Sequence, residues 1–91
     1  MEGFIMRRIP VGYVMQPASE LEAGHTIHIE GKIIEVHTLS EKEEWFDLDS
    51  ELFYFDTAIM VKIQRMKDGE ITERTLPSSS WVRVLNYVDL L

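Results

Sequence analysis

The sequence contains no cysteine and only 3 prolines among its 91 residues, and acidic side chains outnumber basic ones. The absence of cysteine excludes disulfides, thiol catalysis and zinc–thiolate sites. With 9 lysines and arginines against 16 aspartates and glutamates, the net charge is −7, which argues against a surface that embraces a phosphate backbone. We therefore do not expect nucleic acid to be the main partner.

Long apolar stretches are also missing. No run approaches the roughly 20 apolar residues that a membrane-spanning helix needs. Arg7 and Arg8 are not followed by the apolar segment of a signal peptide. These two absences predict a cytoplasmic protein that makes no membrane contact.

The residue patterns of nucleotide-binding and catalytic sites are absent. The 5 glycines are isolated from one another, so neither glycine-rich phosphate-binding fingerprint can be written. Ser78, Ser79 and Ser80 lack a nucleophile elbow and an evident base, and turn formation explains this triplet better. We predict that the protein has no catalytic residues, no cofactor and no enzymatic activity.

Two groups of residues match metal sites in part. Residues 47–52 open like an EF-hand loop, but the glycine and the final bidentate glutamate of that loop are missing. His28, Glu35 and His37 are competent zinc ligands on one face of a predicted strand pair. Because scattered ligand-type residues on an exposed sheet are more typical of a solvated polar face, we predict no metal site.

The chain does have enough apolar residues, 45%, to form one modest core. We predict a single domain over residues 1–91. Its lead-in is irregular or a short strand over residues 1–18, and a β-barrel follows over residues 19–85. An acidic insertion interrupts the barrel at residues 40–52, and residues 86–91 form a tail.

Residues 25–39 carry the clearest hairpin pattern. Two β-branched arms flank Glu30 and Gly31, and an acidic residue followed by glycine is typical of a two-residue hairpin turn. That turn makes one face of the hairpin apolar and buried. The buried face would hold Ile27, Ile29, Ile34 and Val36. The polar face would hold Thr26, His28, Ile33, Glu35 and His37.

Residues 53–66 are aromatic and branched, which predicts a long strand. The Asp-Gly pair at 68–69 predicts a hairpin turn to a strand over residues 71–76. Two registers stay open for this turn. Ile71 lies opposite Met66 in one of them and opposite Arg65 in the other. With a short last strand at residues 81–85, about five strands favour a closed barrel that hides its edges. We predict a mainly β fold, an SH3-like barrel first and an OB-like barrel second.

Residues 41–51 are the one compositional anomaly, with 6 acidic residues and a single lysine. The capping-box pattern at residues 40–43 predicts a short helix. On that helix an apolar stripe would be formed by Trp45, Leu48 and Leu52. In one interpretation the segment is a solvated loop that folds Trp45 or Phe46 back as a lid on the barrel. In the other it is a recognition element, because aromatic residues are enriched among interface hot spots. The residues of that element would be Glu43, Glu44, Trp45, Phe46, Asp47, Leu48 and Asp49.

A second candidate surface is basic. Cationic residues gather on the last three predicted strands, and Arg7 and Arg8 could join them. If they point outward together, this face would contact RNA or the ribosome; its residues are Lys62, Arg65, Arg74 and Arg83. In the other interpretation they are ordinary solubilising charges paired with Glu70 and Glu73.

From residue 19 onward the pattern resembles a known domain. The segment Ser19-Glu-Leu-Glu-Ala-Gly24 precedes Thr26-Ile-His-Ile-Glu-Gly31-Lys-Ile-Ile-Glu-Val36. Together with the later hairpin around Gly69, this resembles the N-terminal SH3-like (KOW-type) domain of bacterial elongation factor P over residues 19–85. The chain also looks like small SH3-like proteins encoded by bacteriophages.

The resemblance implies a barrel and does not imply the activity of a translation factor. In that family a Pro-Gly-rich loop presents a lysine to the ribosome, whereas residues 38–52 here contain no proline or glycine and only Lys42 among the acids. We therefore predict a non-enzymatic protein-interaction module, of phage type or regulatory, that binds a basic protein surface. The alternative is an RNA- or ribosome-associated barrel. A second copy could also pair with the long strand over residues 53–66.

Overall fold

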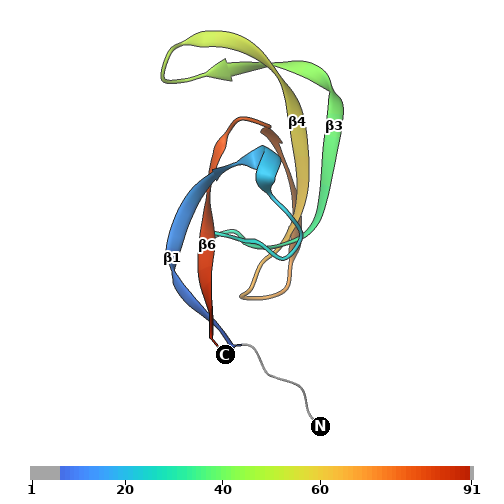
Figure 1. Cartoon of the computed structure of the whole chain (residues 1–91). Helices are drawn as coiled ribbons and strands as arrows, with labels where there is room; N and C mark the ends of the chain where they lie inside the picture. The colour runs from blue at the N-terminus through green and yellow to red at the C-terminus, as the bar shows by residue number, and fades with distance from the viewer. Residues whose placement is uncertain (1–6, 91) are drawn as a thin grey trace.

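The structure is a computed structural model that describes residues 7–90, with side chains described from residue 9 to residue 87. Six strands form one antiparallel sheet in the order β1-β6-β2-β3-β4-β5 (Figure 1). The strands are β1 (Arg7–Pro17), β2 (Thr26–Ile27), β3 (Gly31–Asp47), β4 (Leu52–Gln64), β5 (Ile71–Pro77) and β6 (Trp81–Leu90). Between residues 7 and 90 there is no α-helix, only a 3-10 turn at Ala18–Glu20. The mainly β class is confirmed, but the sheet is not closed, because β1 and β5 are its two edges.

The core lies on the concave side of this curved sheet. β4 shows the reason most clearly, because Ile59, Val61 and Ile63 alternate along it and are all buried. The side chain of Lys62, between them, points to the other face. The other members of the buried cluster are Ala18, Leu21, Ile27, Ile33, Leu76, Val82 and Val84.

The hairpin between β2 and β3 differs from the prediction. Ile27 lies opposite Gly31, so the connection is the three residues 28–30 and not the two residues 30–31. Ile29, expected in the core, is 87% exposed and has a φ of 70°. A branched residue in the left-handed region is unusual. Gly31, which ends this connection, approaches the backbone of Gln64 so closely that a side chain there would clash.

A β-bulge then changes which side chains of β3 face the core. The register with β4 shifts between Ile33 and Glu35, which leaves Ile34 as the extra residue. Ile33, predicted on the polar face, lies before the bulge opposite the buried Ile63 and is fully buried, whereas Ile34, predicted in the core, is exposed. Beyond the bulge Val36 packs against the core as predicted.

The second hairpin has neither of the two predicted registers. Ile71 lies opposite Gln64, so the loop spans residues 65–70. The Arg65 guanidinium donates hydrogen bonds to both carboxylate oxygens of Asp68 at 2.9 and 2.5 Å, and another to Glu70 at 2.6 Å. These side-chain contacts, together with Gly69 at a φ of 75°, close a longer loop than the Asp-Gly pair alone predicts.

The two ends of the chain pair with each other. β1 and β6 form a long ribbon from Arg7 opposite Leu90 to Pro17 opposite Trp81. The lead-in and the tail of the prediction are therefore strands over their described residues. Residues 1–6 and 91, and the side chains of Arg7 and Arg8, lie outside the described part of the chain.

Acid is expected to weaken the loop over residues 65–70. The hydrogen bonds from Arg65 and, second, from the Glu70 backbone N–H lower the pKa of Asp68 from 3.8 to about 2. A carboxyl with a depressed folded pKa stabilises the fold above its unfolded pKa, and this contribution is lost as the pH falls through the folded pKa. We expect the free energy of unfolding to decline between about pH 4 and pH 2. Urea titrations across this range should show a shallower decline for Asp68→Asn, and equal slopes for both proteins would contradict the expectation.

Candidate functional site

The most prominent feature is a hairpin arm that projects from the body of the protein. The register of β3 with β4 shifts between Thr38 and Lys42, and pairing then continues to the tip, from Lys42 opposite Thr57 to Asp47 opposite Leu52. We call residues 42–57 the arm; it forms the upper part of Figure 1. The molecule is consequently elongated, with extents of 56 × 25 × 23 Å.

Asp47 organises the turn at the tip. Its carboxylate accepts hydrogen bonds from the Asp49 backbone N–H at 3.0 Å and from the Ser50 hydroxyl at 2.9 Å. Its carbonyl accepts the Glu51 N–H at 2.8 Å, and Glu51 has a φ of 58°. The acidic residues that open like an EF-hand loop in the sequence therefore form a hairpin turn in which the carboxylate oxygens of Asp47 accept hydrogen bonds from the turn itself.

One face of the arm carries three exposed phenylalanines. Directly opposed residues of an antiparallel pair share a face, so Phe46 and Phe53 lie together, with Phe55 on the next position of that face. The Phe46 and Phe53 rings are 4.9 Å apart between centroids and inclined at 59°. Phe46, Phe53 and Phe55 are 47%, 65% and 68% exposed. We call these three residues the phenylalanine face.

The opposite face of the arm carries Trp45 and Tyr54, which are half-buried and directly opposed. The Trp45 indole N–H donates a hydrogen bond to the Asp56 carbonyl at 3.2 Å. This bond holds the indole against the arm itself.

The predicted recognition residues all lie on the arm, but not as predicted. The helix over this segment is wrong, because pairing with β4 satisfies its backbone along β3. The lid is wrong as well, since no arm residue belongs to the buried core. Trp45 and Phe46 point to opposite faces, as neighbours in a strand must. Glu44 lies opposite Phe55 on the phenylalanine face, Glu43 lies on the Trp45 face, and Leu48 and Asp49 lie in the turn.

Phe53 and Phe55 are not among the predicted recognition residues, because the aromatic stretch over residues 53–66 is interpreted only as a long strand. A signal was present in its length. β4 has 13 residues, whereas the neighbouring β5 has only 7, so the first part of β4 extends beyond the sheet that covers the core. Aromatic residues in such an extension are exposed.

Hydrogen bonds anchor the base of the arm to the body. The Asp56 carboxylate accepts the Ser79 hydroxyl at 2.7 Å and the Ser79 backbone N–H at 3.0 Å. These two bonds, in that order, lower the pKa of Asp56. The hydroxyls of Thr57 and Ser78 lie 2.6 Å apart, and the Ser78 N–H donates to the Thr57 carbonyl. The serine triplet therefore sets the direction in which the arm projects.

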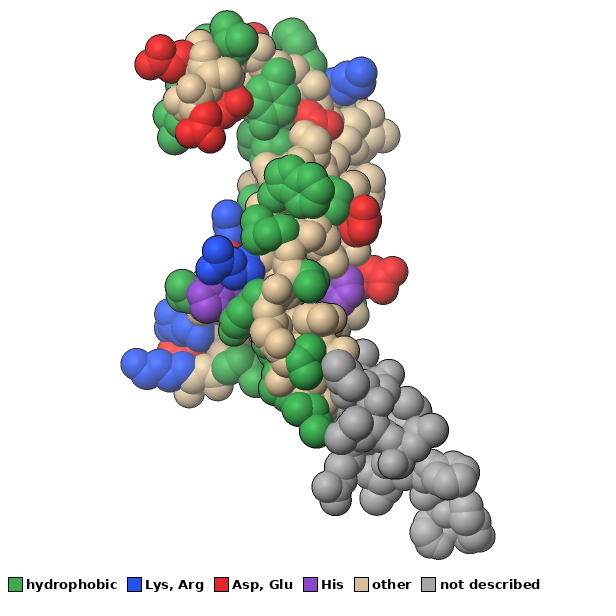
Figure 2. Space-filling view, turned by 60° about the vertical axis from the view of Figure 1, so that its left-hand side comes forward, with side chains coloured by type: hydrophobic (Ala, Val, Ile, Leu, Met, Phe, Trp, Pro, Cys, Tyr) green, Lys and Arg blue, Asp and Glu red, His purple; other side chains and the backbone are tan. Residues whose placement is uncertain are grey.

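The arm also carries most of the negative charge of the protein. Residues 42–57 contain 6 acidic residues and 1 lysine, a net charge of −5, which leaves −2 for the rest of the chain. Figure 2 shows acidic side chains at the projecting end and a group of Lys and Arg side chains on the body. The phenylalanine face therefore lies within a field of negative charge.

The four cations of the predicted basic surface do not form one surface. Lys62 pairs with Glu35 at 3.1 Å, Arg65 with Asp68 and Glu70, and Arg74 with Glu30. Lys62 and Arg74 also lie on opposite faces of the sheet, because Arg74 is paired with the buried Val61. Within the described part of the chain, Arg83 alone of the four forms no ion pair. The pKa of Glu35 is lowered by its hydrogen bond with Lys62 and, second, by its hydrogen bond with His37.

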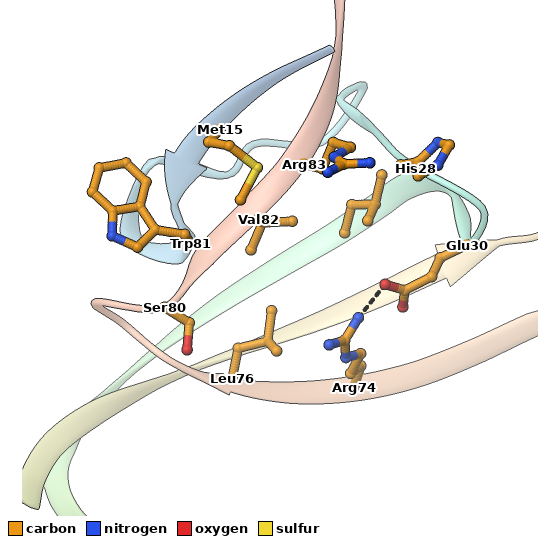
Figure 3. Close-up of a pocket in the computed structure, with 10 residues that line it drawn as sticks. Met15, His28, Glu30, Arg74, Leu76, Ser80, Trp81, Val82 and Arg83 are labelled. Atoms are coloured by element: carbon orange, nitrogen blue, oxygen red, sulfur yellow. Dashed lines mark hydrogen bonds and ion pairs between the residues drawn. The ribbon is translucent and has the colours of Figure 1, made fainter. Parts of the chain in front are cut away.

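A groove of about 380 Å³ is lined mainly by residues of β5, of β6 and of the connection between β2 and β3 (Figure 3). Ile27, Leu76 and Val82 form its apolar floor. Its rim is formed by Met15, His28, Glu30, Arg74, Trp81 and Arg83. The ion pair of Arg74 with Glu30 crosses the opening from β5 to the β2–β3 connection. We call this feature the β5–β6 groove.

His28 is one element of this rim. Its ring packs edge-on against Tyr13 with centroids 4.4 Å apart. Its Nδ1 atom is buried and has no hydrogen-bond partner. His37 and Glu35 do meet, at 3.0 Å, but the residues described contain no group of three potential metal ligands.

Comparison of the chain with protein-family models, curated proteins and solved structures finds no match. Among the described residues, no helix is long and apolar enough to cross a membrane. The fold and the site define the class of the protein as a small, mainly β domain with one open six-stranded antiparallel sheet and an acidic hairpin arm.

Proposed function

We propose that the protein is a non-enzymatic protein-interaction module whose arm binds a basic surface of a protein partner. The curved sheet, in an SH3-like arrangement, acts as the scaffold. The observation that carries the proposal is the phenylalanine face, where three large apolar side chains are exposed on a segment that no other part of the body covers. Exposed apolar patches with a polar rim are typical of interaction sites.

The architecture of the arm supports this function. A two-stranded hairpin is at best marginally stable in water and gains stability when another surface covers it. Each phenylalanine has on the order of 200 Å² of surface. Covering the exposed parts of all three would therefore contribute on the order of 8 kcal/mol before the cost of association is subtracted. That gross gain lies within the range of the cost of association, about 4–15 kcal/mol, so polar contacts at the rim of the face must add to it.

The charge of the arm indicates the chemistry of the partner. Glu44 shares the phenylalanine face, Asp49 and Glu51 lie in the adjoining turn, and the arm has a net charge of −5. Charge of one sign around an apolar centre accelerates encounter with the opposite charge and penalises partners of like charge. The partner surface is therefore cationic at its rim and apolar at its centre. RNA is the weaker candidate, because three of the four cations proposed to bind it already pair with carboxylates.

Selection from a displayed library of random peptides tests this proposal. We expect the wild-type protein to enrich peptides that combine lysine or arginine with large apolar residues. Phe53→Ser with Phe55→Ser should weaken binding of the selected peptides roughly tenfold or more, as loss of hot-spot residues does. The melting temperature should change little, because both side chains are mostly exposed.

Met66→Ser is the matched control, because Met66 is an equally exposed apolar residue in the loop at the other end of the molecule. It should leave the selected binding unchanged. Selection of acidic peptides, or binding that survives loss of both phenylalanines, would show that the arm is not the binding element.

A further inference from the structure

We propose that the β5–β6 groove is a binding site for the arm of a second copy of this chain, so that copies associate head to tail. This inference rests on the proposed function, because it names the partner of the arm. The arm is the donor surface, and the groove, on the body of the next copy, is the acceptor.

The groove has the composition that the arm requires. Its floor of Ile27, Leu76 and Val82 is apolar, and Trp81 on its rim is 66% exposed. Phenylalanine rings of an incoming arm can pack on these side chains, and aromatic pairs gain additional energy from their geometry. The apolar centre of the arm thus finds an apolar centre in the groove.

The polar groups of the rim match the carboxylates of the arm. Arg83 lines the groove and forms no ion pair with any described residue, so its charge is available. Arg74 is held only by Glu30, and a second carboxylate can share its guanidinium, which has five N–H donors. His28, on the same rim, has a buried Nδ1 atom with no hydrogen-bond partner in the isolated chain.

Unpaired strand edges occur on both surfaces. Backbone hydrogen bonds join Glu70 to Arg65 and Ser78 to Thr57. In an antiparallel pair only every second residue bonds to its neighbouring strand, so the backbone groups of residues 71, 73 and 75 point away from β4. The two strands of the arm pair only with each other, so each has a free outer edge. Exposed edges of this kind are templates for pairing with another chain.

The donor and the acceptor are both open in a single chain. No arm residue lines the groove, and the hydrogen bonds of Asp56 and Ser79 hold the arm at its base. The residues outside the arm carry only −2 of the net charge of −7, so an arm that approaches the body avoids the strongest repulsion, which is with another arm. Such a contact joins two different surfaces, and it can continue from copy to copy.

Sedimentation velocity over a range of protein concentrations tests this proposal with two variants. Phe53→Ser with Phe55→Ser removes the donor, and Trp81→Ser with Arg83→Glu removes the acceptor. We expect the wild type to form species larger than a dimer as its concentration rises, and each variant alone to stay monomeric. An equimolar mixture of the two variants should form a dimer and nothing larger, because one intact arm and one intact groove remain. Lys67→Glu, which reverses an exposed charge elsewhere on the body, should assemble like the wild type.

A wild type that is monomeric at all concentrations would overturn the inference. Assembly that survives the acceptor variant, or a mixture of variants that stays monomeric while the wild type assembles, would overturn it too. The proposed function is judged separately. A monomeric wild type that still selects basic peptides through Phe53 and Phe55 would retain that function and lose only the second copy as its partner.

Discussion

Alanine at position 31 is expected to destabilise the protein by about 3 kcal/mol or more. Gly31 has a φ of +135°, which side chains rarely adopt, and an added Cβ would lie 2.3 Å from the carbonyl oxygen of Gln64. That oxygen belongs to the backbone of β4 at a point where Gln64 pairs with both Lys32 and Ile71. Relief of the clash would therefore require movement of three strands.

Gly24→Ala provides the matched control for this prediction. Gly24 has a φ of +101°, but a Cβ there would meet no atom within 4 Å. Only conformational strain remains, and we expect a loss of about 1 kcal/mol. Urea unfolding of both variants measures the difference, provided that the dependence on urea concentration stays the same. Equal losses at the two positions would show that Gly31 does not approach β4 as closely as described.

Shortening Ile33 to alanine is expected to cost about 2–5 kcal/mol, whereas Ile34→Ala should cost less than about 1 kcal/mol. Ile33 is 0% exposed and belongs to the central cluster with Val61 and Ile63, so its truncation leaves a cavity. Ile34 is the extra residue of the bulge and is 39% exposed, so water can occupy the space that its truncation leaves. The two neighbours have the same side chain and the same strand propensity, so only burial distinguishes them.

The same urea titrations serve as the measurement for these two variants. A larger loss at Ile34 than at Ile33 would favour the hairpin with a two-residue turn at Glu30 and Gly31, which the sequence pattern predicts. The experiment therefore decides directly between the register expected from the pattern and the register in the structure.

The sequence pattern indicates which segment forms the candidate site, but not the secondary structure of that segment. The composition of residues 41–51 singles out the segment, because 6 acidic residues stand there beside Trp45, Phe46 and Leu48. Composition does not report pairing, however, and the capping-box pattern at residues 40–43 favoured a helix. A short isolated helix is marginal in water. The long β4 instead pairs with residues 42–47 of this segment, so these residues form a strand.

The β5–β6 groove was not predicted at all. Its residues come from four separate stretches of the chain, from Met15 to Arg83, and none of them is unusual in its local context. Arg74 and Arg83 were predicted to share a surface with Lys62. The curvature of the sheet instead places Arg74 on the inner side, beside Leu76, where it reaches Glu30.

The sequence by itself determined the mainly β class, the sites of chain reversal near residues 30 and 69, and the concentration of acid in one segment. These follow from properties of single residues and near neighbours, namely branching, turn chemistry and charge. Only the tertiary structure decided which isoleucines are buried, because one three-residue connection and one bulge shift the alternation of β3. It alone decided that Phe46, Phe53 and Phe55 share one exposed face, because that face exists only when β3 and β4 pair in this register beyond the core.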